Sequence, residues 1–140
     1  IGIYIDAWDT DTSGISVSNN FVHDISDTGI AMATERGGVL SDIYVNNNIV
    51  YNSYYGGISI EDQTQGADAE ETIVRNVKII NNTLYKNEKC ISVENKHADK
   101  IAVINNICSE NGLKQIAIDL VKNQSSVTID HNLIDRADSS

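Results

Sequence analysis

Short runs of alternating apolar and polar residues recur along the whole chain. The phrase apolar-x-apolar-x-Asn-Asn, with His for the first Asn in its last copy, occurs at residues 15–20, 43–48, 77–82, 101–106 and 127–132. Successive copies start 28, 34, 24 and 26 residues apart. A period of two is typical of β-strands, because successive side chains of a strand point to opposite faces. The repeat therefore predicts an all-β protein.

Each copy of the phrase is followed by a short apolar stretch and then by a second alternating strand, as in residues 29–33, 57–61, 90–94 and 115–119. A coil of about two dozen residues is too small to bury a core alone, so successive coils must stack. Parallel stacking places equivalent residues in buried columns. The expected columns are Ile15, Ile43, Val77, Ile101 and Val127; Val17, Val45, Ile79, Val103 and Ile129; Ile3, Ile30, Ile58, Ile91 and Ile116; and Ile5, Met32, Ile60, Val93 and Ile118.

Asparagine closes almost every copy of the phrase, and the chain contains 16 asparagines. Asparagine adopts left-handed backbone conformations more readily than most residues, which suits a sharp bend between two strands. Stacked amides can also form hydrogen bonds along a solenoid. We therefore expect a structural ladder, and no ligand cluster, at Asn20, Asn48, Asn82, Asn106 and Asn132.

With its three-strand coil and asparagine turn, essentially the whole chain resembles the pectate-lyase-like right-handed parallel β-helices. The resemblance implies one domain over residues 1–140 with about five coils, in which the segment at 57–61 is a first strand. Polysaccharide lyases, glycoside hydrolases, tailspikes and adhesins all occur in this superfamily. Function must therefore be argued from a site. Because no capping helix is recognisable at either end, we expect a fragment of a longer helix, and catalytic residues could lie outside it.

Charge narrows the range of partners. The formal net charge is −10 and the pI is near 4.5. This charge argues against nucleic acid and against anionic membranes as partners, and an anionic polysaccharide would need a bridging divalent cation. The resemblance implies a secreted or cell-surface protein. Cys90 and Cys108 both occupy apolar positions of the repeat, so we expect two buried free thiols.

One outward position at the end of each first strand is acidic in four of five coils: Asp6, Ala33, Glu61, Glu94 and Asp119. The resemblance implies catalytic carboxylates and calcium ligands on this first sheet, under loops that here vary most in length. Adjacent coils rise about 4.8 Å, so we expect Glu61 and Glu94 to lie about 5 Å apart at Cα, and Asp6 and Glu61 roughly 10 Å. Retaining glycosidases separate their two carboxyl groups by about 5–5.5 Å and inverting ones by about 6.5–9.5 Å.

Glu61 and Glu94 are therefore the candidate acid/base pair, with Asp6 as a further catalytic candidate and Asp119 in a supporting role. Two alternatives stay open, namely a solvated acidic face and a calcium bridge between carboxylates. Aromatic side chains at Tyr4 and Trp8 could stack on a sugar. A lyase would need a base and a cation for the uronate carboxylate, and the candidates are Arg36, Lys96 and His97.

A possible calcium site lies in the segment DTDTSG at residues 9–14. Asp9, Asp11 and Ser13 place oxygen atoms at alternate positions before Gly14, as in the opening of a calcium-binding loop. The match fails at the twelfth position, where Asn20 replaces the bidentate Glu. An ordinary turn is the alternative.

Together these features predict a polysaccharide-degrading protein, with glycoside hydrolase slightly favoured over lyase. The alternative is a non-catalytic adhesin, tailspike segment or carbohydrate-binding module. A walled groove over the first sheet would favour an enzyme, whereas a flat open face would favour a structural rod. The sugar, its linkage and the oligomeric state are not determined by the sequence.

Overall fold

The computed structural model describes residues 1–63, 72–118 and 121–135. These residues form fifteen strands in three parallel sheets and one short 3-10 turn, η2 (Gln124–Ser126). Sheet A contains β1 (Ile3–Asp6), β4 (Thr28–Ala33), β7 (Gly56–Ile60), β10 (Lys89–Val93) and β13 (Lys114–Ile118). Sheet B contains β2 (Thr12–Ser18), β5 (Val39–Asn46), β8 (Ile73–Ile80), β11 (Asp99–Ile104) and β14 (Val127–Asp130). Sheet C contains β3 (Phe21–Ile25), β6 (Ile49–Ser53), β9 (Thr83–Tyr85), β12 (Ile107–Ser109) and β15 (Leu133–Ile134).

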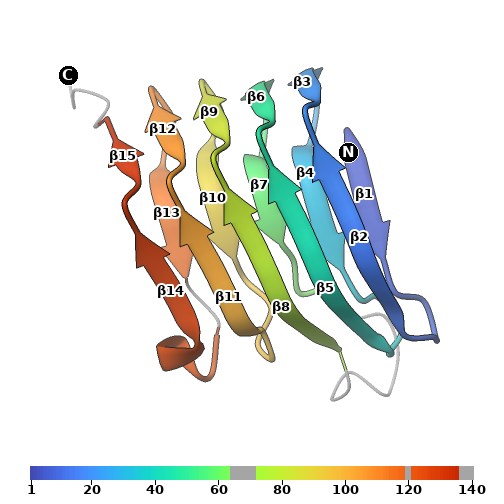
Figure 1. Ribbon diagram of the computed structural model, residues 1–140. Helices are drawn as coiled ribbons and strands as arrows, with labels where there is room; N and C mark the ends of the chain where they lie inside the picture. The colour runs from blue at the N-terminus through green and yellow to red at the C-terminus, as the bar shows by residue number, and fades with distance from the viewer. Residues whose placement is uncertain (64–71, 119–120, 136–140) are drawn as a thin grey trace.

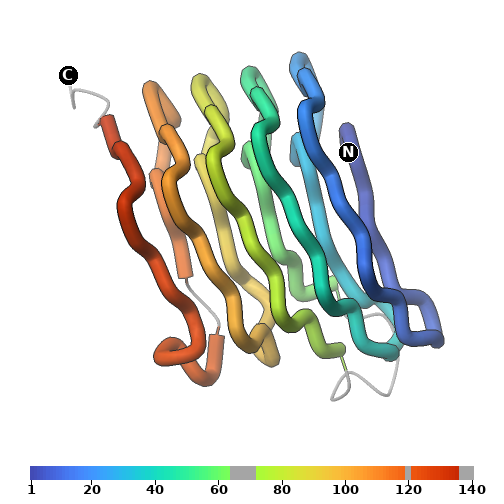
Figure 2. The backbone as a smooth tube through the Cα atoms, in the orientation of Figure 1, coloured from blue at the N-terminus to red at the C-terminus, as the bar shows by residue number. Residues whose placement is uncertain are grey.

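The strands wind into a parallel β-helix. In Figure 1 the strands of sheet B run upward in front, the short strands of sheet C lie at the top, and those of sheet A run downward behind. The chain advances from right to left as it winds, so the helix is right-handed, and the tube in Figure 2 shows the coils side by side. Five strands in sheet A mean four complete turns between β1 and β13.

Strand register confirms the four predicted columns. Ile15, Ile43 and Val77 pair across sheet B, and the register continues to Ile101 and Val127. In sheet A the isoleucine column and its neighbour beginning at Ile5 pair in the same way. Most members of the middle coils are fully buried. The core is therefore a stack of small branched side chains between the three sheets.

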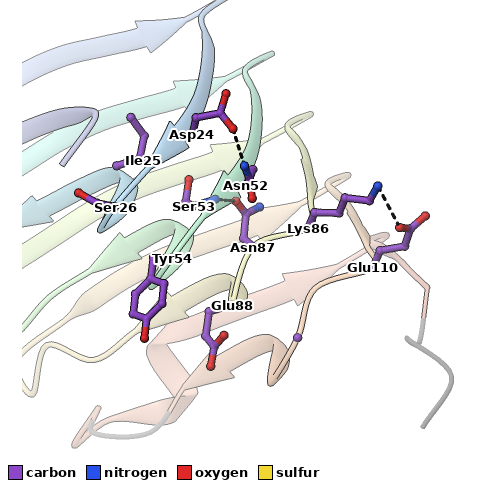
Figure 3. A pocket seen from close by; sticks show the side chains of 11 residues that line it. Asp24, Ile25, Ser26, Asn52, Ser53, Tyr54, Lys86, Asn87, Glu88 and Glu110 are labelled. Atoms are coloured by element: carbon purple, nitrogen blue, oxygen red, sulfur yellow. Dashed lines mark hydrogen bonds and ion pairs between the residues drawn. The ribbon is translucent and has the colours of Figure 1, made fainter. Parts of the chain in front are cut away.

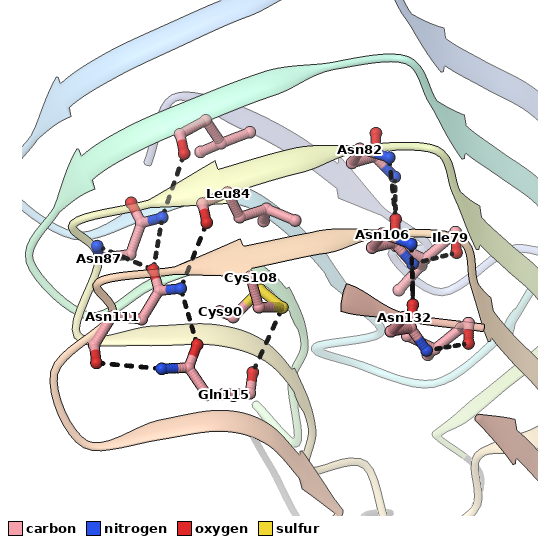
Figure 4. The surroundings of a disulfide bond; sticks show 12 residues. Ile79, Asn82, Leu84, Asn87, Cys90, Asn106, Cys108, Asn111, Gln115 and Asn132 are labelled. Carbon is pink, nitrogen blue, oxygen red and sulfur yellow. Dashed lines mark hydrogen bonds between the residues drawn. A yellow bond between two sulfur atoms is a disulfide. The ribbon is translucent and has the colours of Figure 1, made fainter. Parts of the chain in front are cut away.

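The bend between sheets B and C carries the predicted asparagine ladder. Nδ2 of Asn48 donates to Oδ1 of Asn82 at 3.0 Å, and the backbone N–H of Asn48 donates to the same oxygen at 3.0 Å. The pattern repeats from Asn20 to Asn132, and part of it is drawn in Figure 4. The left-handed backbone, however, belongs to the preceding residue in each coil: Asn19, Asn47, Asn81, Asn105 and His131, with φ between 52° and 59°. Assigning both roles to one asparagine was therefore wrong, because the first residue bends the chain and the second forms the ladder.

A second, shorter ladder lies at the bend between sheets C and A. The backbone N–H of Asn87 donates to Oδ1 of Asn111, and that of Ser53 donates to Oδ1 of Asn87, both at 3.0 Å. Nδ2 of Asn87 also donates to the carbonyl oxygen of Val50 at 3.1 Å. Ser53 therefore occupies the ladder position one coil before Asn87. Its buried Oγ has no hydrogen-bond partner among the described residues.

The two cysteines form a disulfide, so the prediction of free thiols was wrong. Cys90 in β10 and Cys108 in β12 are bonded across the core with their Cα atoms 5.7 Å apart (Figure 4). One coil earlier the equivalent pair is Gly57 and Leu84, and a Cβ added to Gly57 would lie 2.5 Å from Leu84 Cδ2. A glycine facing a bulky side chain fills this space in most coils. Here two side chains of intermediate size meet instead, and they are close enough to bond.

Candidate functional site

Three of the four predicted acidic residues lie in the described part of sheet A or directly after its strands: Asp6, Glu61 and Glu94. Glu61 and Glu94 directly follow Ile60 and Val93, which are register partners. The backbone N–H of Glu61 donates to Met32 O, and that of Glu94 to Ile60 O, both at 2.8 Å. These backbone hydrogen bonds continue the sheet A ladder by one residue, to Glu61 and Glu94. Glu61 and Glu94 therefore occupy the same position on consecutive coils.

A cavity of about 360 Å³ opens beside this pair, and both carboxylates line it. We call it the sheet A cavity. Two buried serines, Ser59 and Ser92, also line it, and their hydroxyl oxygens lie 3.0 Å apart. The lining also includes Asp27, Thr28, Tyr55, Asp62, Gln63 and Lys89. The surface beside the two carboxylates is therefore hollowed.

The Glu61 carboxylate is held by neighbours from two coils. Thr28 Oγ1 donates to Glu61 Oε1 at 3.1 Å, and Gln63 Nε2 donates to Oε2. Burial raises the pKa of Glu61 above its ordinary value, and the charges of Asp27 and Glu94 raise the pKa further, while the two hydrogen bonds oppose the shift. Glu61 thus keeps its proton to a higher pH than an exposed glutamate does, which suits a general acid.

The Glu94 carboxylate has a different environment. Lys89 Nζ lies 2.6 Å from Glu94 Oε1, and the two side chains are 26 % and 29 % exposed. The ammonium group stabilises a negative charge on Glu94. The two carboxyl groups on adjacent coils are both half-buried, and they differ in their partners. Glu61 accepts hydrogen bonds from neutral donors, whereas Glu94 is paired with a cation.

Tyr4 and Asp6 lie further along the same face, toward β1. Tyr4 Oη donates to Glu35 Oε1 at 2.5 Å and approaches Gln63 Oε1 at 3.5 Å, while the backbone N–H of Glu35 donates to Asp6 Oδ1 at 3.4 Å. Burial raises the pKa of Asp6, and the Glu35 charge adds to this shift. Burial and the hydrogen bond to Glu35 hold the pKa of Tyr4 well above its usual range. Gln63 also donates to Glu61, so it connects Tyr4 and Asp6 with the carboxylate pair. Glu61 lies two coils away from Asp6.

Trp8, Arg36 and Asp9 form a separate surface group. Arg36 Cζ lies 5.8 Å from the centre of the Trp8 ring, and Arg36 Nε lies 3.7 Å from Asp9 Oδ2. Asp11 Oδ1 accepts a hydrogen bond from the backbone N–H of Val39 at 3.0 Å, and Ser13 belongs to β2. In the described part of the chain, no group of three or more His, Cys, Asp and Glu is arranged to hold a metal ion. Calcium at Asp9, Asp11 and Ser13 stays a prediction.

Lys96 and His97 point to different neighbours. Lys96 Nζ lies 3.1 Å from Oδ2 of Asp62, which lines the sheet A cavity. His97 Nε2 lies 2.9 Å from Lys122 Nζ, away from the carboxylate pair. The predicted supporting residue Asp119 lies outside the described residues.

A second cavity, which sequence reasoning missed, opens at the bend between sheets C and A. Its volume is about 620 Å³, and Figure 3 shows its lining. We call it the corner cavity. One wall is a column of residues with left-handed backbone, with φ between 51° and 56°: Asp24, Asn52, Lys86 and Glu110. The available signal was a polar residue four positions after the ladder asparagine in each of these coils.

Comparisons with known proteins assign no family. No family model matches the chain, and no solved structure matches it. The chain is similar to the uncharacterized protein YwoF of Bacillus subtilis (strain 168), at 30 % identity over 138 residues, which are 94 % of this chain and 28 % of YwoF. It therefore spans little more than a quarter of the length of that relative. Within the described residues, no helix is long and apolar enough to cross a membrane.

Proposed function

We propose that this protein is a polysaccharide-degrading enzyme of the pectate-lyase-like superfamily, and specifically a retaining glycoside hydrolase. The observation that carries the proposal is the contrast between two adjacent carboxyl groups in one cavity. Glu61 is half-buried and its pKa is raised, whereas Glu94 is paired with Lys89. Two carboxyl groups in such different environments are typical of the acid/base pair of a glycosidase.

The chemistry follows from these environments. Protonated Glu61 donates its proton to the glycosidic oxygen while the Glu94 carboxylate attacks the anomeric carbon, which forms a glycosyl ester and releases the shortened glycan. Ionised Glu61 then takes a proton from water, which attacks the anomeric carbon, displaces Glu94 and restores both groups. One coil, a backbone rise of about 4.8 Å, separates the two residues, so their side-chain rotamers can set the two carboxyl groups at the retaining spacing of about 5–5.5 Å.

The charges of the sheet A cavity favour a neutral glycan. Four acidic residues, Asp27, Glu61, Asp62 and Glu94, line it together with one lysine, Lys89. A uronate would be repelled by this excess of negative charge. Lys89 is paired with Glu94 and Lys96 with Asp62, so these two cations are already engaged by carboxylates. A hydrolase of neutral sugars is therefore favoured over a lyase.

Two further features agree with this function. Tyr55 lines the sheet A cavity with 59 % of its surface exposed, so a sugar ring can stack on it. The disulfide between Cys90 and Cys108 is typical of an oxidising compartment, which supports secretion or display at the cell surface.

The test is hydrolysis of a glycan panel, followed by reducing-end assay. Xylan, mixed-linkage β-glucan, galactan and galactomannan serve as neutral substrates, and polygalacturonate serves as the uronate control. Glu61→Gln and Glu94→Gln keep the side-chain shape, and each should lower turnover by at least about a hundredfold. Asp42→Asn removes one carboxylate on sheet B and should leave turnover unchanged.

Two results would contradict the proposal. Equal turnover in both glutamine variants and the wild type would show that neither carboxylate takes part in the chemistry. Binding of a neutral glycan by the wild type without hydrolysis would instead favour the alternative function, a carbohydrate-binding module or adhesin segment.

A further inference from the structure

The corner cavity and the sheet A cavity lie on the two sides of the same turns. Tyr54 lines the corner cavity and Tyr55 lines the sheet A cavity. One coil later, Glu88 lines the corner cavity and Lys89 lines the sheet A cavity. The Tyr54 and Tyr55 rings meet edge to face with their centres 5.5 Å apart. The two tyrosines therefore form a ridge over which a chain-like ligand could pass from one cavity into the other.

The turns that form this ridge are fixed by the solenoid. The backbone N–H of Tyr54 donates to Ile25 O at 2.9 Å, that of Tyr55 to Asp27 O at 3.1 Å, and that of Glu88 to Ser53 O at 3.2 Å. The short ladder of Asn87 and Asn111 lies directly beside them. Successive coils thus hold the ridge in one position before any ligand arrives, which lowers the entropic cost of binding.

The lining of the corner cavity supplies both acceptors and donors. Asn52 Nδ2 donates to Asp24 Oδ1, and Lys86 Nζ lies 3.8 Å from Glu110 Oε2 (Figure 3). Ser53 forms part of the floor of the cavity, with its Oγ buried toward Gly29. A sugar hydroxyl donates and accepts at once, so a mixed lining of this kind suits sugars better than it suits an ion of either sign.

The fold itself does not require this lining. At the bend between sheets B and C, the left-handed position is held by asparagine in four coils, as expected from its low steric cost. At the corner cavity, Lys86 and Glu110 hold left-handed positions although neither residue favours that backbone. Side chains kept in an unfavourable backbone conformation beside a cavity indicate a role other than folding.

We propose that the corner cavity is a second sugar-binding subsite, which holds a distal part of the same neutral polysaccharide that the sheet A cavity cleaves. The inference rests on the proposed function for its substrate class. Tyr54, with 71 % of its surface exposed, is the stacking platform, and the polar column of Asp24, Asn52, Lys86 and Glu110 binds sugar hydroxyls. A chain long enough to cross the ridge fills both cavities, whereas a disaccharide fills only one.

The experiment measures binding and turnover separately. Affinity electrophoresis in gels containing xylan, mixed-linkage β-glucan, galactan or galactomannan is run in the Glu61→Gln background, so that no polymer is consumed. Adding Tyr54→Ala should weaken retention by the bound polymer about five- to tenfold, because a stacking face is lost. Tyr54→Phe keeps the ring and should restore retention. Tyr44→Ala, which removes an exposed tyrosine from sheet B, is the matched control and should have no effect.

Turnover supplies the second measurement. With Glu61 present, Tyr54→Ala should raise KM for the polymer and leave the cleavage of a short oligosaccharide unchanged. Equal retention of the Tyr54→Ala and Tyr44→Ala proteins, or no retention of the parent protein by any of the four polymers, would overturn the second subsite. Tyr54-dependent retention without hydrolysis by the wild type would support the subsite while refuting the hydrolase, so the two failures are distinguishable.

Discussion

Two of the three bends in each coil differ in regularity. At the bend between sheets B and C, five asparagines form one continuous ladder from Asn20 to Asn132. At the bend between sheets C and A, the ladder contains Asn87 and Asn111, and Ser53 replaces asparagine one coil earlier. Near this second bend, Cys90 occupies the position that Gly57 holds one coil earlier. Both cavities described above adjoin the irregular bend.

This difference shows how a solenoid can separate folding from function. Where the repeat is regular, each side chain packs against or hydrogen-bonds to the neighbouring coils, so replacing it lowers stability. Where the repeat is broken, single coils carry residues that stacking does not require, such as Tyr54, Tyr55 and Lys86. Ligand sites on a uniform rod are therefore expected at its irregular positions.

The largest expected effect concerns the disulfide at the irregular bend. The double variant Cys90→Ala/Cys108→Ala should lower the free energy of unfolding by about 3 kcal/mol, because the bond closes a loop between residues 18 positions apart. Urea denaturation with and without reductant measures the loss. In the double variant, reductant should change nothing. Two titratable thiols in the oxidised wild type would contradict the bond.

The next effect concerns the regular bend. Asn82→Ala should cost about 2–3 kcal/mol, because it leaves the backbone N–H of Asn48 and the carbonyl oxygen of Val45 without partners in a buried setting. Urea denaturation gives the value. Lys78→Ala, an exposed change on the preceding strand β8, is the control and should be nearly neutral. If both variants lost the same small amount, the ladder would have no measurable role.

Completing the irregular ladder should have a smaller effect of opposite sign. Ser53→Asn places an amide where Asn87 has one in the next coil, and Gly29 leaves room beside it as Gly57 does beside Asn87. The new amide should raise the free energy of unfolding by about 1 kcal/mol by forming one hydrogen bond. Ser53→Ala, which only removes the unpartnered hydroxyl, is the matched control. A melting temperature below that of Ser53→Ala would show that the two coils are not equivalent at this bend.

The same contrast explains what could be predicted from the sequence. The columns at Ile15 and Ile58 were predictable because a period of two and a repeat of the coil fix both face and register. The second ladder had a usable signal that was missed, since Asn87 and Asn111 each follow a ladder asparagine by five residues. The disulfide was not predictable from the repeat, because Cys90 and Cys108 lie in different columns and the repeat does not show which columns face each other across the core.

The candidate site was only partly predictable. Register placed Glu61 and Glu94 on consecutive coils, but periodicity does not give the direction of a long side chain. The pairing of Lys89 with Glu94 and the bonding of Gln63 to Glu61 therefore needed the structure. The corner cavity depends on the shape of four successive turns, which no single copy of the repeat encodes.

The smallest expected effect is the pH dependence of stability that Glu61 causes. It distinguishes Glu61 from a residue whose role is to stabilise the fold. Burial raises the pKa of Glu61 in the folded protein above its ordinary 4.5, so the folded state binds its proton more tightly than the unfolded state does. The contribution of Glu61 to stability is therefore greatest below pH 4.5, and it falls as the pH rises from 4.5 through the raised pKa.

Glu61→Gln removes this dependence because glutamine carries no proton to lose. The variant should gain stability relative to the wild type as the pH rises from about 4 to about 7, and the difference should then level off. Urea denaturation across that range measures it. Glu94→Gln is the matched control on the next coil, and it should lose stability at neutral pH because it breaks the ion pair with Lys89. If Glu61→Gln instead lost stability relative to the wild type as the pH rose from about 4 to about 7, the ionised carboxylate would be stabilising the fold. Glu61 would then resemble the ladder asparagines, and the contrast between the regular and irregular parts of the helix would not extend to the carboxylate pair.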